Sequence, residues 1–454
     1  MRVRTWLDRE RTVAAAGFNR WLIPPAALAI HLCIGEIYGF SVFNEPLTRV
    51  LGVHATLKGQ DWTIPQVGWI YSIGLIMLGL SAATLGRWVE RVGPRATMFT
   101  SACCFCGGLI VAAVGVRLHQ IALLYLGYGV IGGIGLGLGY IAPVSTLVRW
   151  FPDRPGLATG LAIMGFGGGA LIGAPLGVGL MGMFRSRTSV GVAEAFLAMA
   201  GLYFVFMQFG AWRVRVPPPG FQPAHFASSG RTDRITDSTS VAVDRAWRMP
   251  QFWLLWLVLC LNVTAGIGIL GQASLMCQSM FQVSPAVAGG FVGVLGLFNM
   301  AGRFVWSSVS DVTGRKLIYG VYFLVGAILY ALIPAIQTTR NVAMFVVVAG
   351  VIISMYGGGF ATIPAYLRDL FGTRHLGAIH GRLITAWSMA AVIGPQLVNY
   401  VSAYQVERGA ARGEAYNTTM YVMAGLLAVG FMCNLAIRQD TRALLEARSG
   451  EVSE

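Results

Sequence analysis

The sequence is dominated by apolar stretches of about 20 residues, each long enough to cross roughly 30 Å of hydrocarbon as a helix. There are twelve of them, six on each side of a polar segment. The composition is 56% hydrophobic and only 11% charged, which is typical of a membrane protein and not of a soluble domain. The sequence therefore predicts an all-α integral membrane protein. The expected spans are residues 21–47, 65–86, 96–116, 120–149, 156–183, 190–212, 250–281, 286–309, 317–337, 341–367, 377–402 and 415–437.

The polar segment between spans six and seven has the composition of a flexible linker. It contains PPPG at Pro217–Gly220, followed by the stretch SSGRTDRITDSTS. We predict five parts: an N-terminal cytoplasmic segment (1–20), a six-helix bundle (21–212), a cytoplasmic linker (213–249), a second six-helix bundle (250–437) and a cytoplasmic tail (438–454).

The two halves of the chain repeat each other at a constant offset. Adding 221 to a residue number takes Glu90 to Asp311 and Gly93 to Gly314. Because six spans separate the two copies, both have the same orientation in the membrane, so the bundles are expected to be related by a parallel pseudo-twofold axis. The same shift aligns Arg95 with Lys316, Pro143 with Pro364, Gly156 with Gly377, Gly160 with Gly381, and Gly173 with Gly394.

The net charge of +14 is distributed in alternate loops, as the positive-inside rule predicts for a membrane protein. This distribution places both termini in the cytoplasm of a cell with a bacterial-type inner membrane, and it argues against a nucleic-acid partner. The seven cysteines nearly all lie inside apolar stretches, where thiols behave as small hydrophobes, so no metal site is expected.

Enzyme signatures are missing from the sequence. It has no HExxH or GxSxG motif, and Lys58 and Lys316 are its only lysines, so no Walker A lysine is available. We expect neither catalytic residues nor a cofactor. The glycines at 165 and 167–169 are expected to let helices approach closely.

Asn299 and Arg303 lie one helical turn apart inside the eighth span. A charge at the centre of a spanning helix costs about 2.5–3.5 kcal/mol, so an arginine there suggests a site. Its guanidinium can hold a carboxylate through two parallel hydrogen bonds, and Asn299 can add a donor or position it. The alternative is an arginine that extends to the membrane surface, roughly 9 Å away.

Four aromatic residues in spans four, ten and eleven form a candidate pocket wall. They are Tyr140, Tyr356, Phe360 and Trp387, which lie near glycine or proline interruptions. Each of them alone also suits the protein core.

Glu36 and His31 in the first span are the candidates for carrying protons. The alternatives are a protonated Glu36 that hydrogen-bonds neighbouring helices, and a purely structural His31.

The turns GRWVERVGPR (Gly86–Arg95) and SSVSDVTGRK (Ser307–Lys316) each combine an acid, a glycine and a cation. They resemble the loop motif of the major facilitator superfamily, as do the twelve spans and the parallel repeat. The resemblance implies acid–base pairs that latch the two halves in one conformation. The latch candidates are Glu90, Arg91, Arg95, Asp311, Arg315 and Lys316.

A narrower resemblance rests on three stretches: RWLIPPAALAIHLCIGEIYGFSVFNEPL, GGIGLGLGYIAPVSTLVRWFPDRPGLATGLAIMGFGGGALIGAPL, and NMAGR in span eight. They look like the oxalate/formate antiporter family, relatives of the monocarboxylate transporters. The resemblance implies a secondary carrier of small organic anions in which Arg303 binds carboxylate, Asn299 assists, and Tyr140, Tyr356 and Phe360 line the pocket.

The chain departs from these families at two positions. Oxalate carriers place a lysine in span eleven, where this chain has Trp387 near the expected position, with Arg382 close to the span's end. Animal monocarboxylate transporters carry an acid where this chain has Asn299. A site with Arg303 as its one cationic clamp, that is, one guanidinium that holds a carboxylate, matches a substrate with a single carboxylate.

The prediction is therefore a secondary active transporter of monocarboxylates such as lactate, pyruvate or formate, working by proton symport or anion exchange with alternating access. Its expected partners are a small carboxylate, protons in the case of symport, and the lipid bilayer, and its functional unit is expected to be a monomer. The alternatives are an oxalate or dicarboxylate exchanger, an exporter of larger amphipathic compounds, and a carboxylate sensor that does not transport.

Overall fold

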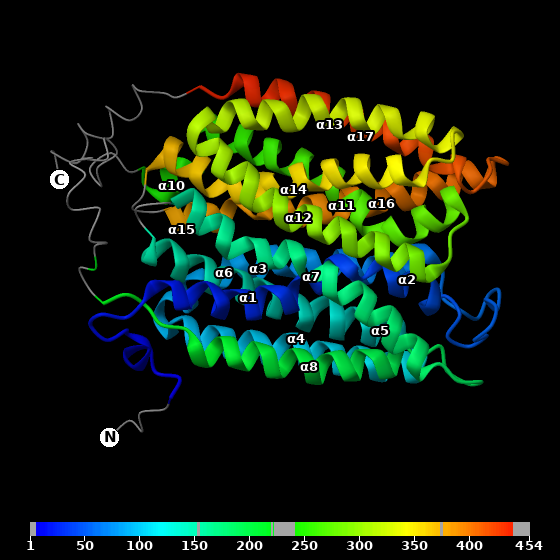
Figure 1. Cartoon of the computed structure of the whole chain (residues 1–454), viewed down its shortest axis with the longest axis horizontal. Helices are drawn as coiled ribbons and strands as arrows, with labels where there is room; N and C mark the ends of the chain where they lie inside the picture. Colours follow the sequence, from blue (N-terminus) through cyan, green and yellow to red (C-terminus); the bar gives the residue numbers. More distant parts are fainter. Residues whose placement is uncertain (1–5, 152–154, 219–220, 222–240, 373–375, 439–454) are drawn as a thin grey trace.

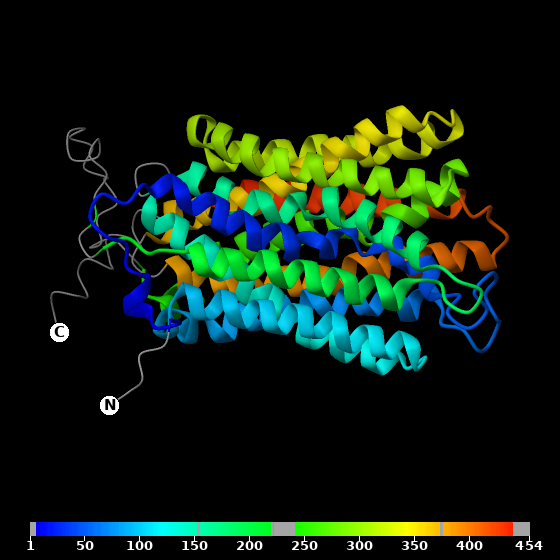
Figure 2. The same ribbon diagram turned by 60° about the horizontal axis from the view of Figure 1, so that its bottom comes forward.

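Long helices run side by side along one common direction in the computed structural model, and the first and last described segments of the chain lie at the same end of the molecule (Figures 1 and 2). We call this end the terminal end and the opposite one the far end. The structure describes residues 6–151, 155–218, 221, 241–372 and 376–438. Parts of the predicted N-terminal segment, linker and tail (1–5, 219–220, 222–240 and 439–454) lie outside the described residues.

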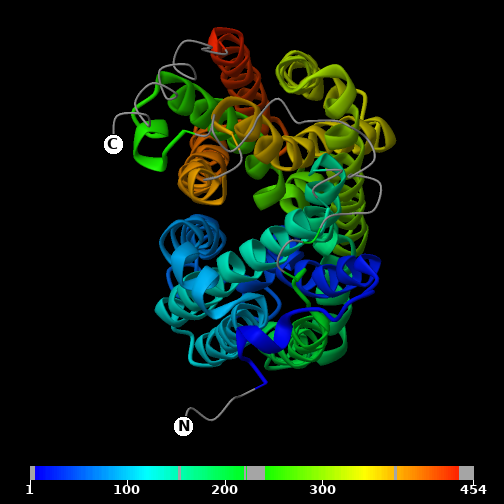
Figure 3. The same cartoon turned by 90° about the vertical axis from the view of Figure 1, so that its left-hand side faces the viewer.

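The first half comprises α1 (Ile23–Ile34), α2 (Ser41–Leu47), α3 (Ile64–Val92), α4 (Pro94–Arg117), α5 (Ile121–Leu124), α6 (Gly133–Trp150), α7 (Pro155–Phe184) and α8 (Val192–Arg213). The second half comprises α10 (Val243–Ala246), α11 (Pro250–Phe281), α12 (Pro285–Thr313), α13 (Arg315–Thr338), α14 (Val342–Phe371), α15 (Leu376–Leu383), α16 (Thr385–Glu407) and α17 (Asn417–Ala436). The halves form two groups of helices when viewed from the terminal end (Figure 3).

Eleven helical segments of the described chain are long and apolar enough to cross a membrane. The predicted eleventh span, 377–402, corresponds instead to α15 and α16, and α16 is less apolar than the other long helices. Its polar residues Gln396 and Asn399 are buried, and α16 packs against α3 of the other half. The low hydropathy of α16 thus follows from its place between the halves.

The sequence repeat appears in the backbone of the two charged turns. Gly93 ends α3 with φ +85°, and Gly314, which corresponds to it at the offset of 221, ends α12 with φ +92°. Glycine adopts a positive φ without steric cost, so it allows an abrupt turn into the next helix. Both turns therefore have the same geometry.

The first membrane-crossing segment is not one continuous helix. A short 3₁₀ turn, Gly35–Gly39, separates α1 from α2 and carries Glu36 and Tyr38. This turn lies against α7 at backbone contact: a Cβ on Gly35 would come within 2.2 Å of the Phe166 carbonyl oxygen. The close approach orients Tyr38 toward the second half.

The two halves touch part-way along their helices. Asn44 Nδ2 of α2 donates to the Gly271 carbonyl of α11 at 3.1 Å. Ser388 Oγ of α16 donates to the Ile76 carbonyl, near the middle of α3, at 3.0 Å. In addition, α7 packs against α12 over most of its length. The large side chains that lie between the halves, such as Trp387, are fully buried, so residues at mid-depth are enclosed.

Candidate functional site

Arg303 lies on α12 and is fully buried between the two halves. Its Nε donates to Asn299 Oδ1 at 3.0 Å, as expected for residues one turn apart, and its Nη2 donates to the Tyr38 hydroxyl at 3.3 Å. Nη1 has no hydrogen-bond partner in the described part of the chain. The guanidinium thus does not extend to the surface, which was the alternative to a binding role.

Two glycines make room for this arginine. A Cβ on Gly167 of α7 would lie 2.7 Å from Arg303 Nε, and one on Gly357 of α14 would lie 2.4 Å from Asn299 Oδ1. Larger residues at either position would displace the Arg303–Asn299 pair. The glycines flanking the site are therefore required by packing.

Aromatic rings surround the guanidinium. Its central carbon lies 5.3 Å from the Phe360 ring centroid, 5.7 Å from that of Phe166 and 6.0 Å from that of Tyr38. These distances allow cation–π attraction, which offsets part of the cost of burying the charge.

The same rings continue into a wall made by both halves. Trp387 packs 4.3 Å from Phe360 and 5.5 Å from Tyr140. Tyr356 packs 5.3 Å from Phe360 and shares a 2.6 Å hydrogen bond with Tyr38. The structure therefore brings together all six residues predicted as a binding site.

Tyr38 and Phe166 belong to this site but were not predicted from the sequence. Tyr38 is two residues after Glu36 in the GEIYG stretch, and Phe166 stands alone among the glycines of MGFGGG. The sequence could have indicated Phe166, because it is a large ring inside a run of small residues. The glycines around it have no side chains to cover the ring, so the ring is left to contact the neighbouring helices.

Several buried donors in the site have no partner among the described residues: Arg303 Nη1, Asn299 Nδ2, Tyr140 Oη and Trp387 Nε1. Leaving such a group unpaired costs about 1–3 kcal/mol, and more for a charged one. In addition, none of the ion pairs of the described chain involves Arg303. The site thus has excess donors and positive charge, and an anion with acceptor oxygens would satisfy both.

Glu36 lies in a separate buried location in the first half. Its Oε2 accepts a 3.0 Å hydrogen bond from Tyr128, and its Oε1 has no partner in the described residues. Glu36 makes no ion pair with Arg303. His31 lies closer to the site: its Nε2 donates to the Tyr140 carbonyl at 3.4 Å, and its ring packs against Tyr140 and Phe166.

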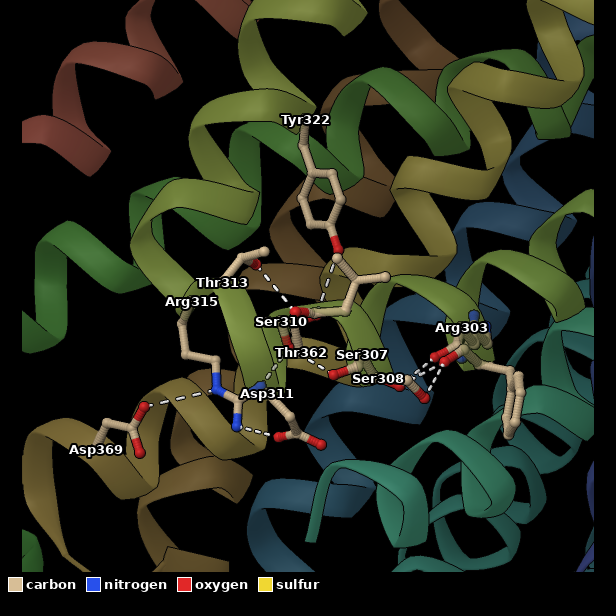
Figure 4. Close-up of polar contacts among 12 residues, drawn as sticks. Arg303, Ser307, Ser308, Ser310, Asp311, Thr313, Arg315, Tyr322, Thr362 and Asp369 are labelled. Atoms are coloured by element: carbon tan, nitrogen blue, oxygen red, sulfur yellow. Dashed lines mark hydrogen bonds and ion pairs between the residues drawn. The ribbon is translucent and has the colours of Figure 1, made fainter. Parts of the chain in front are cut away.

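The charged turn after α12 forms a cluster well removed from Arg303 (Figure 4). Arg315 hydrogen-bonds Asp311 and lies 3.6 Å from a carboxylate oxygen of Asp369 on α14. All three residues belong to the second half, so this cluster joins α12, α13 and α14 and does not bridge the halves. Eight residues, about 12 Å of helix, separate Asp311 from Arg303.

The remaining latch candidates have other surroundings. Lys316 Nζ donates to the Leu435 carbonyl at 2.8 Å, and Arg95 Nη2 donates to the Val214 carbonyl at 3.5 Å. These two contacts correspond at the offset of 221, and each places a cation at the end of the last long helix of its half. Carbonyls there have no partner within the helix and attract cations. Arg91 is exposed, and the side chain of Glu90 lies outside the described part.

A family model described as Major Facilitator Superfamily matches residues 12–395 and 272–452. The chain belongs to the major facilitator superfamily. Among its curated relatives, the oxalate:formate antiporter of Oxalobacter formigenes is 28% identical over 83% of each chain. The apicoplast pyruvate carrier 1 of Toxoplasma gondii is 25% identical over 91% of this chain and 88% of its own.

The fold of the superfamily is also found by structural comparison. A bacterial homologue of the human lysosomal transporter Spinster superposes with a TM-score of 0.67 over 96% of this chain and 99% of the other, at 15% sequence identity. The predicted major facilitator fold and the resemblance to oxalate/formate antiporters are confirmed. The prediction that the chain is not an enzyme is also confirmed, because the matched family and relatives are transporters.

Proposed function

We propose that this major facilitator transporter carries small monocarboxylates of the lactate, pyruvate or formate type, by proton symport or by exchange for another carboxylate. The observation that supports this most directly is Arg303, which is fully buried at the meeting point of the halves. Among the described residues it pairs with no carboxylate, and its Nη1 has no acceptor. A substrate carboxylate would accept from Nη1 and neutralise the charge.

The charge of the pocket favours one carboxylate over two. Trp387, near the position where oxalate carriers have a lysine, packs in the aromatic wall. Arg382 of α15 is used elsewhere: it donates to Asp244 Oδ1 at 2.9 Å and to the Val243 carbonyl at 3.3 Å. A dicarboxylate would thus bring one negative charge that no cation of the described site offsets.

The transport cycle proposed here is alternating access, in which the halves rock about Arg303 and Tyr38. The full burial of Arg303 and Trp387 between the halves would correspond to an intermediate that encloses the substrate. We further propose that both termini lie in the cytoplasm, that the protein resides in a bacterial-type inner membrane, and that one chain is sufficient for transport.

Uptake of labelled monocarboxylates and dicarboxylates into proteoliposomes, with and without a pH gradient, tests this function. We expect saturable uptake of at least one monocarboxylate and little uptake of oxalate or succinate. Preferred dicarboxylate uptake would contradict the single-clamp argument. Binding without flux would indicate a sensor, and uptake of large amphipathic compounds without carboxylate preference would indicate an exporter.

Glu36→Gln tests whether the buried carboxyl group of Glu36 carries the coupled proton. Glutamine keeps an acceptor for the Tyr128 hydroxyl but cannot release a proton. We expect exchange of internal for external substrate to persist, while accumulation driven by a pH gradient falls about tenfold or more. Tyr128→Phe is the control for the hydrogen bond alone. Undiminished accumulation in Glu36→Gln would leave Glu36 with a structural role.

A further inference from the structure

A large groove lies away from the substrate site, between α13 and α17 at the terminal end, where the two helices run side by side along one edge of the molecule (Figures 1 and 3). Its volume is ≈ 1000 Å³. Its floor includes Gly320, where a Cβ would be 3.7 Å from the Phe431 ring, so the small residue deepens the groove. The position and size of the groove do not follow from the transport mechanism.

The walls of the groove are apolar and open to the outside of the bundle. Leu317 and Leu324 on α13 are 62% and 55% exposed, and Leu435 on α17 is 49% exposed. In a membrane protein this surface faces lipid tails. A soluble metabolite would gain little from such walls, whereas an acyl chain would pack along them.

The end of the groove near the helix termini is cationic. Arg315, Lys316 and Arg438 line it, together with the carboxylate of Asp369. The charge of Arg315 is offset by Asp369 and Asp311, so Lys316 and Arg438 are the cations that remain for an outside acceptor. Lys316 donates to the Leu435 and Ile437 carbonyls, which leaves one of its three N–H donors for another acceptor. Arg438 is exposed at the rim.

We propose that this groove binds an anionic phospholipid, with its phosphate at Lys316 and Arg438 and an acyl chain along Leu317 and Leu324. The juxtaposition of a basic end and an apolar, lipid-facing trough matches both parts of such a molecule. A zwitterionic lipid offers the same chain but carries a positive group that the basic rim disfavours. The bound phosphate lies next to Arg315, so the lipid also shields the ion-pair cluster of α12, α13 and α14.

The test is thermal unfolding of the purified full chain in detergent, titrated with phosphatidylglycerol or with phosphatidylcholine of the same acyl chains. A ligand of the folded state raises Tm in a saturable way. We expect phosphatidylglycerol to raise Tm and phosphatidylcholine to do so much less. Equal effects of the two lipids would overturn the proposal. A full effect of glycerol 3-phosphate alone would overturn it as well, because the groove would then be a site for small soluble anions.

Two matched pairs of variants locate the effect. Leu324→Trp fills the groove, whereas Ile328→Trp adds the same ring one turn along α13 at a position that is 53% exposed and outside the groove. Arg438→Gln removes a rim charge, and Arg340→Gln removes an exposed charge after the opposite end of α13. We expect the half-saturating lipid concentration to rise about tenfold in Leu324→Trp and Arg438→Gln only. An unchanged response in both would refute the site.

Discussion

Replacing Arg303 by lysine is expected to reduce carboxylate uptake by about 10- to 100-fold. A charge-assisted hydrogen bond contributes about 1.5–3 kcal/mol, and each 1.4 kcal/mol corresponds to a factor of ten. Lysine keeps the charge but loses the planar fork, which now contacts Asn299 and Tyr38 and whose Nη1 has no partner in the described part of the chain. The fall in uptake therefore reports on the geometry of the guanidinium more than on its charge.

The measurement is the initial rate of labelled pyruvate or lactate uptake into proteoliposomes, normalised to the amount of folded protein. The control is Arg408→Lys, the same change at an arginine that has no role in binding. Arg408 follows the last residue of α16, at the far end of the molecule. If Arg303→Lys takes up substrate as fast as the wild type, the bidentate clamp is wrong. Wild-type flux of large amphipathic compounds through that variant would support the exporter alternative.

The helices of this fold were predictable because each must satisfy its own hydrogen bonds in lipid, so length and hydropathy along the chain are enough to locate them. The predicted span 250–281 coincides with α11 (Pro250–Phe281). The interruptions of the helices at Gly35–Gly39 and between α15 and α16 were not predicted. They depend on packing against the other elements, and hydropathy does not report that packing.

Part of the site was predictable for the same local reason. Asn299 and Arg303 are one turn apart on one helix, so the sequence alone indicates their contact. Tyr38 contacts Arg303 from 265 residues away, and no spacing rule connects residues of different bundles. The repeat predicted the glycine turns and the equivalence of Arg95 and Lys316. It did not predict the backbone carbonyls that these two side chains bind, because equivalent backbones do not specify where long side chains reach.

Gly169→Ala is expected to be among the most destabilising single-methyl changes in this protein. A Cβ at this position of α7 would lie 2.2 Å from the Gly35 carbonyl carbon and 2.6 Å from the Glu36 nitrogen, both backbone atoms that cannot rotate aside. Overpacking of a tight contact costs about 1–3 kcal/mol and forces the backbone to shift. Since that backbone carries Glu36 and Tyr38, transport should fall together with stability.

Gly179→Ala on the same helix is the matched control, since nothing lies within 4 Å of a Cβ there. Alanine favours a helix over glycine by up to about 1 kcal/mol, so this control should unfold at the same temperature as the wild type or slightly higher. The comparison of Tm for the two variants separates helix propensity from contact. Equal Tm values would show that the 3₁₀ turn at Gly35 can move away from α7 without cost. The close approach would then not be what positions Tyr38 against Arg303.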